Sequence, residues 1–174
     1  MNEENQKPPF PKGKGSWEGT KYKRLTSEEL QSLENEFIHF LASAQITGDD
    51  WVKMKANELK KAEELIDVFS DVVYDKILRK IKYLEFRDIK TLNIFYCATD
   101  KIILAGMRVK EQSSLDLTTS DIFTKWKEED LSMVNLIKTE KKYSKEREME
   151  VFELLQSGCL ITDDKLFNAL MDSF

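Results

Sequence analysis

The period of the apolar residues changes from helical to alternating near residue 81 of this chain of 174 residues, and that change restricts the fold more than any other feature. Over residues 25–80 apolar side chains recur every three or four positions, which predicts amphipathic helices. Beyond this segment the runs are rich in β-branched and aromatic residues, which predicts strands at 83–87, 92–98 and 101–109. Thr99-Asp100 is a tight connection between the last two runs, so we expect a meander of antiparallel strands.

The start of the first helix is marked by two local signals. Thr26 and Glu29 have the spacing of a capping box, and Leu25 and Leu30 have that of a hydrophobic staple. The helix should then bury one stripe of side chains, formed by Leu30, Leu33, Phe37, Phe40, Leu41 and Ala44. A new helix start follows in the stretch ITGDDW, with Thr47 or Asp49 as its N-cap.

A longer helix is expected over about residues 58–80, where it pairs with the first helix as an antiparallel hairpin. Its apolar positions are Leu59, Ala62, Ile66, Phe69, Val73 and Ile77, broadened by Leu65, Val72 and Ile81. Four carboxylates at helical spacing form an acidic stripe on this helix: Glu64, Asp67, Asp71 and Asp75. We interpret the stripe as a solvated face, and a docking surface for a basic partner is the alternative.

The C-terminal part returns to helices after one more strand. A short helix is predicted at 120–127, where it contains Trp126, and a fourth strand at 133–138. Ser144 should cap a helix that ends at Gly158, and a last helix should begin at Thr162. The predicted fold class is therefore α+β, with an N-terminal helical hairpin, a small antiparallel sheet of about four strands and two C-terminal helices.

Charge and composition divide the chain into an arm and a body. Residues 1–24 contain six basic and three acidic side chains, a net of +3, so the remaining 150 residues carry −8 of the total of −5. All three prolines and three of the six glycines lie before residue 20. We expect residues 1–20 to form a disordered, basic, Pro/Gly-rich arm and residues 21–174 to form a single globular α+β domain. No signal peptide or apolar stretch long enough to cross a bilayer is found, so we place the protein in the cytoplasm, away from the membrane.

Residue types that carry catalysis are scarce. His39, the only histidine, projects nearly opposite the buried stripe of its helix, which favours a surface position over a catalytic one. Cys97 and Cys159 lack CxxC spacing, so we expect reduced thiols and no metal site. The basic run over 138–147 is interrupted by glutamates, as in an exposed loop and helix start. Neither a phosphate-binding glycine motif nor an HExxH or GxSxG motif occurs, so we expect no enzyme and no cofactor, and we identify no small-molecule substrate.

The arm is the strongest candidate for a binding site because it interleaves aromatic residues with cations. The predicted contact residues are Pro8, Pro9, Phe10, Pro11, Lys12, Lys14, Trp17 and Tyr22. The proline segment suits an aromatic-lined groove on a partner protein, which predicts an interaction or adaptor module. The alternative is an RNA- or ribosome-associated accessory factor, in which cations contact phosphates and aromatics stack on bases. A third interpretation is that the aromatics fold back onto the body or make no functional contact.

The chain also resembles a known family. The stretch KYKRLTSEELQSLENEFIHFLASAQITGDDW, the continuation AEELIDVFSDVVYDKILRKIKYLEFR and the closing ITDDKL are similar to uncharacterised cytosolic proteins of Bacteroidetes, including Flavobacteria, that share a domain of unknown function. The resemblance covers the body from about Lys21 to the C-terminus and leaves the arm outside. It implies a bacterial cytosolic protein and assigns no functional residue.

Overall fold

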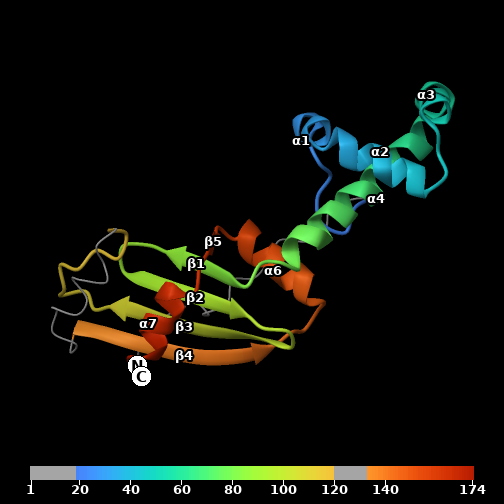
Figure 1. The fold of residues 1–174 in the computed structure, drawn as a ribbon. Helices are drawn as coiled ribbons and strands as arrows, with labels where there is room; N and C mark the ends of the chain where they lie inside the picture. The colour runs from blue at the N-terminus through green and yellow to red at the C-terminus, as the bar shows by residue number, and fades with distance from the viewer. Residues whose placement is uncertain (1–18, 120–132) are drawn as a thin grey trace, which may run out of the picture. The chain divides into compact units, whose positions relative to one another are not determined.

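The computed structural model describes residues 19–119 and 133–174 (Figure 1). Contacts between residues divide it into two compact units. We call them the helical unit, described over residues 19–78, and the sheet unit, described from residue 79 onwards. The expected disorder of the arm falls almost wholly outside the described residues. The expectation of one domain over 21–174 stays a prediction.

The helical unit contains α1 (Ser27–Ser32), α2 (Glu34–Ser43), α3 (Gly48–Asn57) and α4 (Leu59–Leu78). Both predicted helix starts are confirmed. The hydroxyl of Thr26 accepts the N–H of Glu29, whose carboxylate accepts the N–H of Thr26 at 2.7 Å. Thr47 forms the same reciprocal pair with Asp50. Each capping box therefore gives a partner to two backbone N–H groups that would otherwise be unpaired at the helix start. Both partners come from within four residues of sequence.

The first predicted helix is divided in two at Leu33, which ends α1 and precedes α2. Leu33 has φ −108° and ψ 24°, outside the helical range. Immediately before it, the hydroxyl of Ser32 donates to the carbonyl oxygen of Glu29 at 2.7 Å. Side-chain hydrogen bonds of this kind compete with the helical ladder and often bend helices.

The core of the helical unit is aromatic. Phe37 of α2 lies edge-on to Phe69 of α4 at a ring-centroid distance of 4.9 Å and edge-on to Trp51 of α3 at 5.2 Å. The predicted apolar face of α4 is wrong at both ends and at one middle position, because Leu59, Ile77 and Val72 are 62%, 48% and 50% exposed. A helix of 20 residues is about 30 Å long, so the 10-residue α2 covers only about half of it. Ala44 is also exposed, just past the end of α2.

The sheet unit is built on five antiparallel strands in the order β4-β3-β2-β1-β5. Their bounds are β1 Tyr83–Arg87, β2 Thr91–Cys97, β3 Lys101–Val109, β4 Val134–Lys142 and β5 Leu160–Thr162. The predicted meander of the first three strands is confirmed, and β4 runs four residues further than expected. The expected helix at 120–127 lies outside the described residues.

Helix α7 (Lys165–Met171) packs across one face of the sheet, over β2 and β3 (Figure 1). The cluster on this face contains Leu92, Ile94, Ala105, Met107, Val109, Leu115, Leu117, Val134, Phe167 and Leu170. Tyr83 and Tyr96 stack at 5.0 Å, and each lies 5.6 Å from Phe167. Because side chains alternate along a strand, the opposite face carries a second buried set, Leu84, Phe95, Cys97, Ile102 and Leu104.

Two predictions for the C-terminal part are wrong. Ser144 does not cap a helix; its N–H and hydroxyl both donate to Glu150, and α6 (Arg147–Gln156) begins three residues later. The segment at Thr162 is the end of strand β5 rather than a helix start. Gly158 has the left-handed φ of +98° predicted for the end of a helix. Among the helices of the described residues, none is long and apolar enough to cross a membrane.

Candidate functional site

The arm is joined to the helical unit by an anchored segment, residues 20–25, that lies along α4. The carboxylate of Asp71 accepts hydrogen bonds from the backbone N–H groups of Lys21 and Tyr22. Lys21 donates to the two oxygens of Asp71 at 3.0 and 2.8 Å, and Tyr22 donates to Oδ1 at 3.1 Å. Charge-assisted hydrogen bonds to backbone donors are stronger than neutral ones, so Asp71 holds the peptide itself.

Tyr22 is the next contact, and its side chain is fully buried. Its hydroxyl donates to Asp75, and its ring centroid lies 6.0 Å from that of Tyr74. Lys21 places its Nζ 3.3 Å from Asp75 and 4.9 Å from the centre of the Tyr22 ring. Burial, followed by the hydrogen bond to Asp75, raises the pKa of Tyr22 to about 12.

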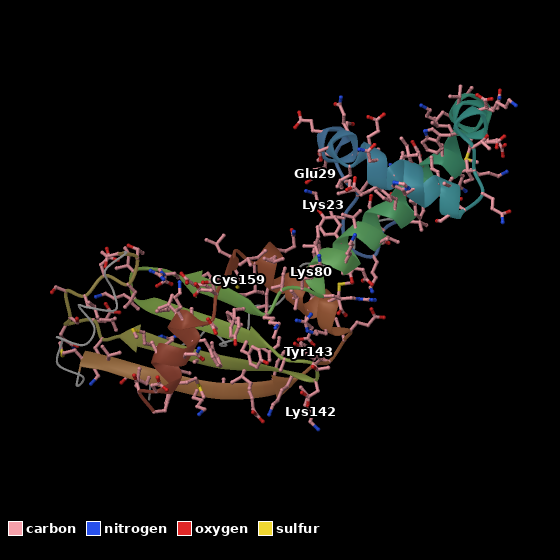
Figure 2. The ribbon with its side chains drawn as sticks, viewed as in Figure 1. Lys23, Glu29, Lys80, Lys142, Tyr143 and Cys159 are labelled. Carbon is pink, nitrogen blue, oxygen red and sulfur yellow. The ribbon has the colours of Figure 1, made fainter. Side chains whose placement is uncertain are left out.

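Arg24 and Leu25 complete the anchor. Arg24 binds Asp67 through Nε and Nη2, and the Nη2–Oδ2 distance is 2.7 Å. The hydrogen bond to Asp67 raises the pKa of the guanidinium. Leu25 donates its N–H to the hydroxyl of the buried Ser70 at 3.1 Å. Lys23, labelled in Figure 2 near Glu29 of α1, is the remaining cation of the segment.

The anchored segment corrects the interpretation of the acidic stripe. Asp67, Asp71 and Asp75 are buried or half-buried and bind residues 21–24, whereas Glu64 alone is exposed. The stripe is therefore a docking surface for a basic segment, and that segment belongs to the same chain. A usable signal was present: carboxylates at i, i+4 and i+8 on a helix, together with the basic KYKR run.

The histidine and the two cysteines lie in different environments. His39 is exposed on α2, as predicted. Burial raises the pKa of Cys97 to about 12 and that of Cys159, labelled in Figure 2, to about 11. Both thiols are therefore protonated at neutral pH, whereas the thiolate is the reactive form. Within residues 19–119 and 133–174, no three His, Cys, Asp or Glu side chains are grouped so that they could hold a metal ion.

The basic run over 138–147 is more integrated into the fold than an exposed loop. Glu150 of α6 is 4% exposed and binds Lys141 at 2.6 Å and the N–H groups of Ser144 and Lys145. Burial acts to raise the pKa of Glu150, but these hydrogen bonds outweigh it and lower the pKa. Arg147 donates to the carbonyl oxygens of Cys97 and Ala98, which ties α6 to the end of β2.

Lys142 and Tyr143, which are adjacent in the basic run and labelled in Figure 2, differ in environment. Lys142 is exposed, whereas the half-buried Tyr143 donates its hydroxyl to Ala98 at 2.8 Å. Lys141, Tyr143 and Arg147 of this run therefore form contacts that stabilise the sheet unit.

Sequence reasoning missed an apolar surface at the edge of the sheet. Leu160 and Ile161 of β5 are 71% and 61% exposed. The strand is only three residues long and follows the glycine that ends α6, so the run carried too few residues for a strand signal.

A family model described as a family of unknown function, DUF6495, matches residues 20–174. The chain belongs to the DUF6495 family. The match includes the anchored segment of this DUF6495 protein and excludes residues 1–19 of the arm. No curated protein and no solved structure matches the chain.

The predicted contact residues of this DUF6495 protein fall into two groups. Tyr22 lies in the anchor, where its side chain has no exposed surface. The other seven, Pro8, Pro9, Phe10, Pro11, Lys12, Lys14 and Trp17, lie outside the described residues. Of the three interpretations of the arm, folding back onto the body applies to Tyr22.

Proposed function

We propose that this DUF6495 protein is a non-enzymatic interaction or adaptor module of the bacterial cytoplasm, which holds a partner protein through the arm that precedes the anchor. The observation that carries this proposal is the clamp that three aspartates of α4 form on residues 21–24. It gives the arm a fixed point of departure from a folded unit. A partner that binds the tethered arm is held at a high effective concentration near any second contact site on the body.

The charge of the arm favours a protein partner over RNA. Residues 1–20 contain three lysines and three glutamates, so their side chains sum to zero, and the expectation of a basic arm over these residues is corrected. The positive excess resides in Lys21, Lys23 and Arg24, and the first and last of these are paired with Asp75 and Asp67. Binding to nucleic acid relies on cations that neutralise several phosphates together, and this segment offers few that are unpaired. Proline and aromatic contacts do not require such an excess.

The chemistry of the described residues supports a role without catalysis. The histidine is exposed, and the thiols have raised pKa values. Nucleophilic catalysis requires an activated nucleophile in contact with a base, and neither thiol has the lowered pKa that would activate it.

The test is affinity capture from native cells after chemical crosslinking, followed by mass spectrometry. The full chain is compared with a variant lacking residues 1–18 and with the double variant Phe10→Ser, Trp17→Ser. A charge variant replaces Lys7, Lys12 and Lys14 by Gln, and Lys7→Gln alone is the matched control, because Lys7 is not one of the predicted contact residues. We expect the deletion and the double variant to lose a shared set of proteins that Lys7→Gln retains. Identical sets for all five proteins would overturn the proposal.

The same experiment separates the RNA alternative. Capture is repeated after nuclease treatment and over a range of salt concentrations. Association through RNA would vanish with nuclease, weaken steeply with salt and be lost in the lysine variant. That pattern would replace the protein-partner proposal.

A further inference from the structure

The exposed apolar side chains of the helical unit include a regular pair on α4. Val68 and Val72 are 51% and 50% exposed, and they stand four residues apart on neighbouring turns. Glu64 precedes the pair by four residues and Lys76 follows it by four, and both are exposed. The four side chains therefore form one continuous i, i+4 ridge: acid, valine, valine, base.

The two ends of the ridge carry charges that the described part of the chain leaves without ion-pair or hydrogen-bond partners. This holds for Lys76 and for Glu64, which is attracted electrostatically by Lys61 of the same helix but forms no ion pair with it. Asp67, Asp71 and Asp75 on the adjacent face bind the anchored segment. The opposite charges at its two ends make the ridge complementary to itself when it is reversed. Two exposed valines and two unpaired opposite charges in one row match a partner with the same row in the opposite direction.

We propose that this ridge is a self-association surface, on which α4 of one chain crosses α4 of a second copy about a two-fold axis. Ridges of the i, i+4 type interdigitate when helices cross at about −50°, and the two ridges then run side by side. In the antiparallel arrangement Val68 lies beside Val72 of the second copy, and Glu64 lies beside Lys76 of the second copy. Each contact occurs twice, as a two-fold axis requires.

The geometry limits unfavourable contacts at the ends of the helices. Glu64 and Lys76 each lie six residues, or about 9 Å along the axis, from the midpoint between the valines. At this distance from the crossing point, the long side chains of Glu64 and Lys76 can still reach each other across the two helices. Lys60 and Lys61 lie further out, where helices crossing at this angle have diverged. The contact is small, so we expect a weak dimer with a dissociation constant on the order of 100 μM.

Sedimentation velocity on the full chain, from about 5 μM to about 1 mM, tests the proposal because this range brackets the expected constant. The wild-type protein should shift from monomer to dimer across it. Val68→Asp and Val72→Asp should each leave a monomer at every concentration. Val52→Asp is the matched control, since Val52 is 61% exposed on α3 of the same unit and should leave the dimer unchanged. Circular dichroism of each variant checks that the helices are retained.

Charge reversal gives a second, sharper test. Glu64→Lys and Lys76→Glu should each raise the dissociation constant about 5-fold or more, because two like-charged pairs then face each other. The double reversal should restore it to within about 2-fold of wild type, since the attractive pairs are re-formed. A chain that stays monomeric, a dimer that survives both aspartate variants, or a double reversal that fails to restore would each overturn the proposal. A surviving dimer would point to the β5 edge instead. Because residues 1–20 take no part, loss of the dimer and loss of arm-dependent partners are independent outcomes.

Discussion

Arg24 binds the nearly buried carboxylate of Asp67 with two of its nitrogens, although the two residues are 43 positions apart in the sequence. The pair holds the end of the anchored segment against α4, immediately before the capping box that starts α1. The stability of the helical unit therefore depends on a contact that neither local sequence contains.

A double-mutant cycle with Arg24→Gln and Asp67→Asn should measure the strength of this pair. We expect a coupling of about 1–2 kcal/mol in urea unfolding, because the bond is bidentate and Asp67 is largely buried while Arg24 is half exposed. The exposed pair Lys101 and Glu140, at 2.8 Å on the sheet, is the control and should couple by less than about 0.5 kcal/mol. Equal couplings for the two pairs would contradict the role given to burial.

Tyr22→Phe should remove a pH-dependent part of the stability. The pKa of Tyr22 is raised from 10.0 to about 12, so folding favours the protonated phenol. That stabilisation is complete below pH 10 and declines as the pH rises towards 12. Wild type should therefore be more stable than Tyr22→Phe by about 1–2 kcal/mol at pH 8, and the difference should shrink above pH 10. Urea unfolding at several pH values measures it, and a constant difference up to pH 11.5 would refute the assignment.

Gly19→Ala should destabilise the anchor by about 1–2 kcal/mol. Gly19 has φ +88°, and an added Cβ would lie 3.0 Å from Oδ2 of Asp67. Gly48→Ala is the matched control, since nothing lies within 4 Å of its added Cβ and it begins a helix. It should be neutral or stabilising by up to about 1 kcal/mol. Thermal unfolding of both variants decides, and a harmless Gly19→Ala would show that the anchor tolerates rearrangement.

Cys97 and Cys159 should be inert in the folded protein. Burial raises their pKa values to about 12 and about 11, so the thiolate is rare at pH 8. We expect a disulfide reagent such as DTNB to titrate neither thiol in the native protein within minutes and both thiols in urea. Rapid native reaction of either one would contradict the inert assignment and reopen a role in cysteine chemistry.

The candidate site was predictable only in part. The KYKR run and the four carboxylates were each recognised in the sequence, but their meeting was not, because the ion pairs join residues more than 40 positions apart. The surface position of His39 was predictable, since the helical period alone determines which residues oppose an apolar stripe. The seven predicted contact residues that lie before residue 19 stay predictions.

Features whose physical causes lie within a few residues could be predicted from the sequence alone. These are the capping boxes at Thr26 and Thr47, the limits of β1 and β3, and the left-handed Gly158. Tertiary structure decided whatever depends on a distant partner. A three-residue run such as β5 becomes a strand only because β1 offers a free edge, and an aspartate such as Asp71 leaves solvent only because two distant N–H groups replace the water. Local patterns show which surfaces a segment offers, and the free energy of burying them against specific neighbours selects the partner.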